Sequence, residues 1–300
     1  MEIISENVYK IYKVKEKAFK YKKLEVVSNF NYKIEQGEII ALLGISNSGK
    51  STIVKLLSGE ETPTSGKILI NGKIDYKILK KHSEILNDFR KRKLLTNESI
   101  YNNLVYYGNK LKIDSNDIEK RIVELRDVLE LEKIINKKVS EISSLDLMKL
   151  NIAISMLKNP SIIYFDDALT QVDTIEKNTL LKLLKRLNKE FKTTIVIAST
   201  NILDVEKICK RATILKNGNI IADDKYEIIK NKLLNNKILN VTFNKSYNIP
   251  KGNFEILENN DYYLKVKIDF NQFDFASFIN QFDINTIIDI NISPIALETL

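Results

Sequence analysis

The sequence predicts an α/β protein with an antiparallel N-terminal part, a helical insertion and a small α+β unit at its C-terminal end. A strand-like run at 38–43 leads into the glycine-bounded loop 44–52, and a helical pattern follows. Two continuous apolar runs, 161–165 and 194–198, read as buried parallel strands, and the helical pattern 174–190 separates them. Strands that alternate with helices in this way are typical of a parallel sheet covered by helices.

The loop at 44–52 contains the residue types that hold nucleotide phosphates. Gly44 and Gly49 let the backbone curl so that successive N–H groups point at phosphate oxygens. Lys50 can reach the β- and γ-phosphates, the Ser51 hydroxyl can coordinate Mg²⁺, and the following helix adds its positive dipole end. An ordinary strand–turn–helix connection is the alternative, but both glycines, the lysine, the serine and both flanks favour a phosphate site. The residues expected to bind nucleotide here are Gly44, Ser46, Asn47, Ser48, Gly49, Lys50, Ser51 and Thr52.

Composition limits the other possibilities. Lys and Arg number 47 against 39 Asp and Glu, a net charge of +8, which could attract nucleic acid or an anionic membrane. The lysines are spread evenly along the chain, so we expect no nucleic-acid partner. The single cysteine, Cys209, rules out an internal disulfide and fits a reducing compartment. No apolar run approaches the roughly 18 residues that span a bilayer, so a soluble chain is expected, with any membrane link through a partner.

The N-terminal residues 2–35 alternate as strands do. Between them lies a lysine-rich run, 10–23, which includes Tyr12 and Tyr21. Lysines interleaved with aromatics could hold single-stranded nucleic acid. A solvated hairpin is favoured, because edge strands commonly carry lysine.

The rest of the chain alternates between helical and strand patterns. A helical subdomain is expected at about 88–157, and a domain boundary divides 1–225 from 226–300. Before this boundary the expected strands are 67–70, 82–86, 161–165, 194–198, 211–215 and 218–222, and the helices are 98–107, 118–129, 146–157, 174–190 and 202–209. Beyond it we expect strands at 238–243, 254–257, 262–268 and 286–292, and a helix at 273–282.

Over about residues 2–223 the chain resembles the nucleotide-binding subunit of an ATP-binding-cassette (ABC) transporter, on its phosphate loop and on the buried strand that ends in Asp166-Asp167. The closest likeness is the exporter branch with a separate ATPase polypeptide. The C-terminal unit looks like the appended domain of drug and lantibiotic exporter ATPases, and the closing segment 292–298 is similar to their "PSLED" ending. The resemblance implies a P-loop core, ATP, Mg²⁺, a membrane permease and a head-to-tail dimer of cassettes.

Several residues match positions with family roles. Tyr12 lies where an aromatic stacks on adenine, and Asn47 and Ser48 replace the commoner Gly-Ala of the phosphate loop. Asp166 matches the aspartate that holds Mg²⁺ through water, and Asp173 matches that of the loop crossing the dimer interface.

Other positions depart from the family. Asn87 falls on the glutamine that senses metal and water, Asp167 on the catalytic glutamate and Thr200 on the histidine that grips the γ-phosphate. The resemblance thus makes Asp167, Lys50 and Thr200 catalytic, and Ser51, Asp166 and Asn87 metal-binding. Asp167 is one methylene shorter than glutamate, and a displacement of about 1 Å can cost on the order of a hundredfold in rate.

The signature sequence, usually LSGGQ, reads Ile142-Ser143-Ser144-Leu145-Asp146. Ser143 would contact the partner's nucleotide if the signature works. The alternative is a capping box, Ser143-x-x-Asp146, which starts a helix, and we favour this reading.

The predicted function is ATP binding with slow or partner-dependent hydrolysis that powers export by a permease, with the chain at the inner face of the cell membrane. A homodimer would combine a weak catalytic half with a weak signature at both sites, which favours a heterodimer with a second ABC ATPase. A non-hydrolysing ATP-dependent switch is the alternative. A soluble cassette that acts on nucleic acid is a third possibility, against which the appended C-terminal unit counts.

Overall fold

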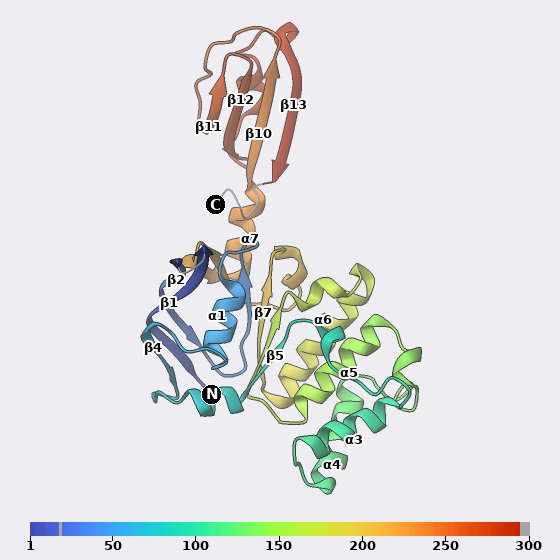
Figure 1. The fold of residues 1–300 in the computed structure, drawn as a ribbon. Coiled ribbons are helices and arrows are strands. Elements are labelled where there is room, and N and C mark those ends of the chain that lie inside the picture. Colours follow the sequence, from blue (N-terminus) through green and yellow to red (C-terminus); the bar gives the residue numbers. More distant parts are fainter. Residues whose placement is uncertain (18–19, 295–300) are drawn as a thin grey trace. The chain divides into compact units, whose positions relative to one another are not determined.

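The computed structural model describes residues 1–17 and 20–294 of the 300-residue chain. The chain divides into two compact units, with the boundary between Asp224 and Lys225 (Figure 1). In the described part, no helix combines the length and apolarity needed to cross a membrane.

An antiparallel sheet forms the N-terminal part of the first unit. β1 (Ile3–Lys17) and β2 (Lys20–Ile34) pair as a long hairpin, and β1 also pairs with β4 (Ser65–Ile70). The hairpin predicted over the lysine-rich run is therefore confirmed. Val8, Val27 and Phe30 are buried, whereas the lysines nearer the tip are exposed. Near the tip the apolar side chains of Val14 and Tyr21 are exposed as well, so the two kinds of side chain are separated by their position along the hairpin.

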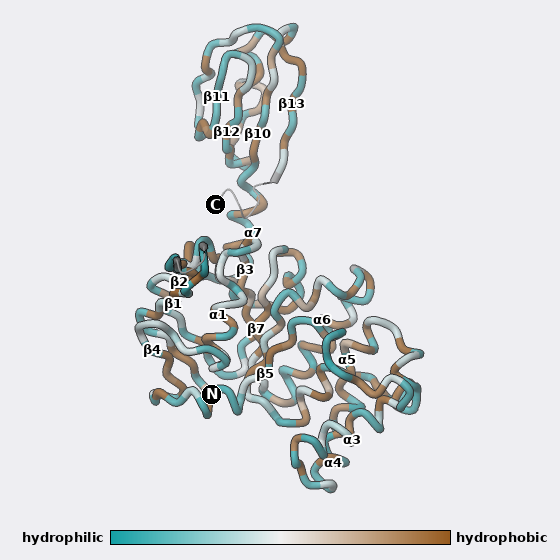
Figure 2. The backbone as a smooth tube through the Cα atoms, in the orientation of Figure 1, coloured by the Kyte–Doolittle hydropathy of each residue, from teal (hydrophilic) through white to brown (hydrophobic). Residues whose placement is uncertain are grey.

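A six-stranded sheet forms the middle of this unit. Its strand order is β5-β6-β7-β3-β8-β9, and the pairs from β5 to β8 are parallel. The apolar runs predicted as strands are buried on both faces. Figure 2 shows hydrophobic stretches, in brown, within this part of the chain. The strand bounds are β3 Ile39–Leu43, β5 Ser83–Leu86, β6 Ile162–Asp166, β7 Thr194–Ser199, β8 Arg211–Lys216 and β9 Asn219–Lys225.

The register of this sheet gathers three strand ends at one edge. Leu43 of β3 pairs with Ser199 of β7, and Asp166 of β6 pairs with Ala198. The phosphate loop follows Leu43, and Asp167 follows Asp166. The carboxyl ends of parallel strands are where such sheets place ligands.

Helices flank the sheet and form the insertion. Figure 1 shows α3 and α4 on the side of α5 away from the sheet. The helices of this unit are α1 Lys50–Leu57, α2 Tyr76–Lys81, α3 Ile100–Lys110, α4 Ser115–Val128, α5 Ser144–Met156 and α6 Thr174–Phe191. Short 3₁₀ helices are η1 Phe89–Lys91, η2 Val139–Glu141, η3 Ala168–Gln171 and η4 Ile202–Val205.

One local prediction in this unit is wrong, and one short helix was not predicted. The helix expected over 202–209 is only the 3₁₀ turn η4. The buried Asp204 carboxylate accepts bonds from Lys177, Ser199 and Asn201, which fixes the turn locally. The sequence analysis also did not predict the short helix α2.

The second unit is a four-stranded antiparallel sheet with order β11-β12-β10-β13. Its core gathers Leu239, Val241, Leu264 and Val266 against a phenylalanine cluster that includes Phe278. Its elements are α7 Tyr226–Asn235, β10 Asn236–Phe243, β11 Glu255–Asn260, β12 Tyr263–Asp269, α8 Phe275–Ile279, η5 Ile284–Thr286 and β13 Ile287–Pro294.

Here too the structure corrects details. Helix α7 lies where only a boundary was expected, and the helix expected over 273–282 is limited to α8. Of the closing segment 292–298, residues 295–298 lie outside the described residues.

Candidate functional site

The loop between β3 and α1 is held by backbone bonds to neighbouring strand ends. The Gly44 N–H donates to Ser199 O (3.3 Å), and the Gly218 N–H donates to Ser48 O (2.9 Å). A Cβ on Gly44 would lie 2.6 Å from Leu215 O, so only glycine fits there. Gly49 has φ +100°, a left-handed conformation that glycine adopts without steric cost. Both loop glycines are therefore required by the backbone.

Asn47 also lies in the left-handed region, with φ +65°. Asparagine tolerates this conformation better than other residues with a side chain. The replacement of the family's usual glycine by Asn47 is therefore compatible with a phosphate-binding shape of the loop.

Lys50 is folded into the loop and is 4% exposed. Its Nζ donates to Gly44 O (2.7 Å) and Ile45 O (2.9 Å). Burial lowers the pKa of Lys50, and the charges of Asp167 and Asp166 oppose that shift. The amine is thus held beside the two aspartates at the start of α1.

Ser51 and Asp166 face each other across the site. Ser51 Oγ donates to Asp166 Oδ1 over 3.0 Å. Burial raises the pKa of Asp166, and the Ser51 hydrogen bond opposes the shift. A hydroxyl and a carboxylate are hard oxygen ligands that suit Mg²⁺, which in proteins is usually held by one or two carboxylates plus phosphates and water. These two residues fit that ion, and within the described ranges no cluster of three or more His, Cys, Asp or Glu forms a separate metal site.

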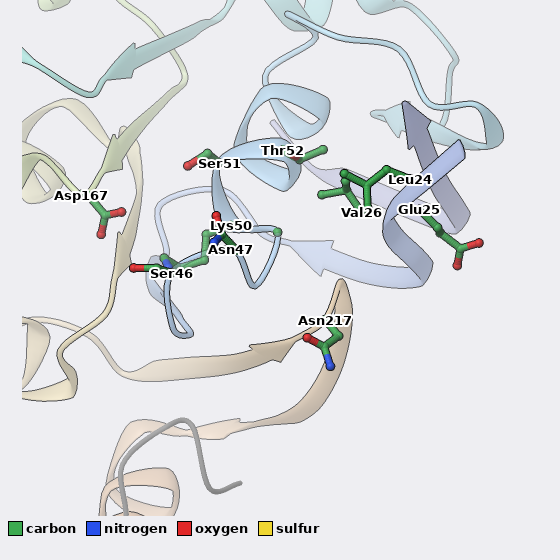
Figure 3. Close-up of a pocket in the computed structure, with 11 residues that line it drawn as sticks. Leu24, Glu25, Val26, Ser46, Asn47, Lys50, Ser51, Thr52, Asp167 and Asn217 are labelled. Carbon is green, nitrogen blue, oxygen red and sulfur yellow. The ribbon is translucent and has the colours of Figure 1, made fainter. Parts of the chain in front are cut away.

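Asp167 follows β6 with φ +52°, again in the left-handed region. Its N–H donates to Ala198 O (3.1 Å), which ties it to β7. Its Oδ1 is buried and has no hydrogen-bond partner among the described residues. Figure 3 shows its carboxylate turned towards the side of the hollow where Ser46 and Ser51 lie.

Several of these residues, among them Lys50, Ser51 and Asp167, line one open hollow of about 690 Å³ (Figure 3). This volume lies within the range of about 300–1,000 Å³ of ligand sites. One end is polar and holds Lys50, Ser51 and Asp167. The other end is formed by β2 and by Thr52 of α1. The lining residues are Leu24, Glu25, Val26, Ser46, Asn47, Gly49, Lys50, Ser51, Thr52, Asp167 and Asn217.

Of the predicted site residues, Gly44, Ser48, Ser143 and Asp166 are not part of this lining. Neither are Tyr12, Asn87 and Thr200. The Tyr12 hydroxyl donates to Glu61 Oε2 over 2.6 Å. Asn87 is exposed after β5, and its Oδ1 accepts from the next residue's N–H over 2.7 Å. Thr200 is exposed beyond β7. Since their side chains are bonded locally or exposed, their family roles stay predictions.

The signature segment begins a helix. Ser143 is the N-cap of α5, and its Oγ accepts from the Asp146 N–H over 3.1 Å. The capping prediction is confirmed for this bond. Asp173 likewise caps α6, because Oδ1 accepts from the N–H groups of Ile175 and Glu176. The side chains of Ser143 and Asp173 thus both cap helices of this chain.

Sequence reasoning missed the residues that line the hollow from β2 and from the β8–β9 turn. Leu24 pairs directly with Tyr12 in the hairpin, so a register prediction would have drawn attention to it. Asn217-Gly218 read only as a turn. The Gly218 N–H bonds to the phosphate loop and brings Asn217 to the hollow.

Comparison with known proteins adds the following findings. The family described as "ABC transporter" matches residues 27–170. The methionine import ATP-binding protein MetN of Francisella tularensis subsp. holarctica is 36% identical over 203 residues, which is 65% of this chain and 57% of that protein. A MetN 1 of Oenococcus oeni is 30% identical over 210 residues, 68% of this chain and 60% of its own length. The chain thus spans less than two thirds of either relative.

Solved structures are similar to about three quarters of this chain. The structure of cbiO1 from Clostridium perfringens, part of the ABC transporter complex cbiONQ, has a TM-score of 0.67 and 23% identity, covering 76% of this chain and 90% of that one. A dimeric post-hydrolysis state of the ATP-binding cassette MJ0796, bound to ADP and Pi, has a TM-score of 0.60 and 26% identity, covering 75% and 98%. These likenesses confirm the predicted fold class.

Proposed function

The chain has the fold of an ABC-type ATP-binding cassette, and from that premise we propose that it binds ATP with Mg²⁺ and hydrolyses it as the nucleotide-binding subunit of a membrane transporter. The observation that carries this proposal is the grouping of Lys50, Ser51, Asp166 and Asp167 at one edge of the sheet. Their chemistry matches the needs of phosphoryl transfer, which depends on positioning and on stabilising charge.

Different residues of the chain would bind the phosphates, bind Mg²⁺ and orient the attacking water. The loop N–H groups and the Lys50 amine hold the phosphates, and Lys50 exchanges its two carbonyl partners for phosphate oxygens. Ser51 and Asp166 hold Mg²⁺, which when bound neutralises charge on the phosphates. Asp167 orients a water whose oxygen bonds to the γ-phosphorus as the bond to the bridging oxygen breaks. ADP keeps the electron pair, and the water's protons pass to phosphate and solvent.

Lys50 gives the direct test of binding. Lys50→Ala should weaken Mg-ATP affinity at least tenfold in calorimetry, because removal of a cation that bonds phosphate costs more than about 1.4 kcal/mol. Lys55→Ala is the matched control, because Lys55 is an exposed lysine of the same helix that pairs with Glu61 at 3.5 Å. Equal affinities of wild type and Lys50→Ala would refute the proposed phosphate site.

A non-hydrolysing switch is a second candidate function. It is favoured by the positions of Thr200 and Asn87, neither of which lines the hollow. Both functions predict ATP binding, so binding does not separate them. Single-turnover hydrolysis by the full chain, measured with its co-purified partner, does: release of phosphate that Asp167→Asn abolishes supports the ATPase, and no release supports the switch.

The partners and the direction of transport are finer parts of the proposal. We propose a permease and a second cassette, a heterodimer because the signature segment of this chain is occupied in capping α5. The chain would then lie at the inner face of the cell membrane. Export follows from the resemblance of the C-terminal unit, whereas the relatives' names state methionine import. Co-purification from native membranes, followed by uptake and efflux assays with the recovered permease, tests both.

A further inference from the structure

Gln171, which sequence reasoning assigned no role, joins two loops at the edge of the core sheet. It is the last residue of η3, the turn that begins after Asp167. Its Nε2 donates to the backbone oxygen of Asn87 over 2.5 Å. Leu86 of β5 pairs with Phe165 of β6, so Asn87 leaves its strand beside Asp166. The Gln171 side chain therefore reaches back to the strand ends that carry the site.

The orientation of the Gln171 amide follows from its partner. A backbone oxygen only accepts, so the amide nitrogen must face Asn87 O. The amide oxygen, Oε1, then points elsewhere, and it is buried without a hydrogen-bond partner in the described structure. A buried acceptor without a partner is rare and calls for a donor such as an ordered water.

The Asp167 carboxylate also contains a buried acceptor that lacks a hydrogen-bond donor in the described part of the chain. Its Oδ1 is also buried without a partner among the residues described. The two residues belong to one turn, which is closed by bonds from the Thr170 N–H and the Thr170 hydroxyl to Asp167 O, at 3.3 and 2.6 Å. One short turn thus presents two acceptors that the rest of the chain leaves unsatisfied.

We propose that Gln171 is a water-positioning residue, which supplements the short Asp167 carboxylate during ATP hydrolysis. A water molecule carries two hydrogens, and the turn offers two acceptors for such donors. A glutamine amide is chemically suited to this work, because it orients the attacking water in other phosphoryl-transfer enzymes. The bond to Asn87 O fixes the amide so that its oxygen stays available. This inference rests on the hydrolytic function proposed above.

The test compares three variants of the full chain, each assayed together with the co-purified partner. Gln171→Leu removes both the acceptor and the donor, and Gln171→Glu keeps acceptor oxygens but loses the N–H to Asn87 O. Thr170→Val is the matched control, because it removes a side-chain bond within the same turn but leaves both unsatisfied acceptors. Three quantities are measured for each: the single-turnover rate, the affinity for Mg-ATP, and the affinity for ADP with aluminium fluoride, which imitates the transferred phosphoryl group.

The expected result is selective. Gln171→Leu should lower the rate and the affinity for ADP with aluminium fluoride about tenfold each, with Mg-ATP affinity within about twofold of wild type. Thr170→Val should stay within about threefold of wild type in all three quantities. Gln171→Glu keeps an acceptor but loses the bond that fixes it, so its rate should lie between those of wild type and Gln171→Leu. In the double variant with Asp167→Asn, the loss of affinity for ADP with aluminium fluoride should be smaller than the sum of the two single losses, because both residues act on water in one turn.

Other outcomes overturn the inference. If Thr170→Val is as slow as Gln171→Leu, general loosening of the turn explains the loss. If Gln171→Glu is as slow as Gln171→Leu, retention of an acceptor oxygen has no effect on the rate, which contradicts the inference. An unchanged Gln171→Leu in a chain that turns over ATP refutes the inference alone. Absence of turnover by the wild-type chain even with its co-purified partner refutes the hydrolytic function, and the inference with it.

Discussion

Ser51 Oγ donates a 3.0 Å hydrogen bond to Oδ1 of Asp166, a residue 115 positions further along the chain. The bond joins the first turn of α1 to the last residue of β6. Both ends are placed by regular structure, one by a helix start and the other by a buried strand. A pair of oxygen ligands is therefore held in place by the folded core, before any ion binds, which reduces the ordering cost of binding.

The pKa of Asp166 makes nucleotide binding sensitive to acid. Burial raises this pKa, so the carboxylate takes up its proton at a higher pH than an ordinary aspartate as the solution is acidified. Mg²⁺ needs the ionised form. Mg²⁺-dependent ATP affinity should therefore be full at high pH and should fall, as the solution is acidified, at a higher pH than an unperturbed aspartate would require. Calorimetric titrations at several pH values measure this decline.

Asp166→Asn is the matched variant for this experiment, because it keeps the side-chain shape but cannot ionise. Its Mg-ATP affinity should be weak and nearly the same at all of these pH values. ATP titrations with a metal chelator correct for protonation of the nucleotide. If the variant declines as steeply as the wild-type chain, the titrating group is not Asp166.

At the end of the hollow formed by β2 and Thr52, where we expect the nucleoside to bind, Leu24 and Tyr12 differ in their positions. Leu24 lines the hollow, whereas the hydroxyl of Tyr12 is bonded to Glu61. We expect Leu24→Ala to weaken ATP affinity about three- to tenfold through lost apolar contact, and Tyr12→Leu to weaken it less. Inorganic triphosphate, which has no base, should bind all three proteins equally. A larger loss for Tyr12→Leu than for Leu24→Ala would instead support the stacking role predicted from the family.

The parts of the fold that the sequence predicts well are those with strong local signals. The run ending at Phe165 is apolar throughout, and the loop from Gly44 to Lys50 combines glycines with a lysine, so both were found. The roles of Leu24 and Gln171 depend on contacts between distant segments. Hairpin register places Leu24 at the hollow, and a bond across 84 positions places the Gln171 amide. Neither leaves a periodic signal in the chain.

Short helices were the other source of error. Helix α2 has six residues and η4 has four, and segments this short carry less than two turns of hydrophobic periodicity. α2 depends on Asp75, whose side chain accepts from the Ile78 N–H over 2.9 Å. At η4 the buried hydrogen bonds of Asp204 outweigh helix propensity, because a buried carboxylate must be satisfied.

Ser143 provides a test of its capping role. Its Oγ accepts from the Asp146 N–H at the start of α5, and loss of such a cap costs about 1 kcal/mol. Ser143→Ala should lower the free energy of unfolding by about that amount, and Ser143→Asp should restore most of it. Urea denaturation measures both. Single-turnover hydrolysis by the chain alone should stay within about twofold for Ser143→Ala. A loss of rate without loss of stability would show that the phosphate-contact reading is correct.

Asp167 provides a test of whether its short carboxylate limits the rate of the proposed ATP hydrolysis. If its carboxylate still orients water and is merely set back, Asp167→Glu should raise the single-turnover rate about tenfold, which is about 1.4 kcal/mol of barrier. The left-handed backbone at this position, φ +52°, favours aspartate over glutamate, so the same change should lower the melting temperature by a few degrees. We therefore expect Asp167→Glu to raise the hydrolysis rate and to lower the melting temperature.

Whether Asp167→Glu raises the hydrolysis rate should depend on the signature segment that meets the nucleotide in the dimer. In a homodimer, Ser144 and Leu145 occupy positions where the family has glycine, and the Ser144 hydroxyl donates to Glu176 over 2.8 Å. Asp167→Glu alone should then gain little until both are changed to glycine. With a partner whose signature is intact, the single change should suffice. Rates are therefore measured for Asp167→Glu and for the triple variant, each with and without the co-purified partner. If none of the four combinations gains, the shortened carboxylate is not what limits the rate, and the ATP-dependent switch becomes the better account of this chain.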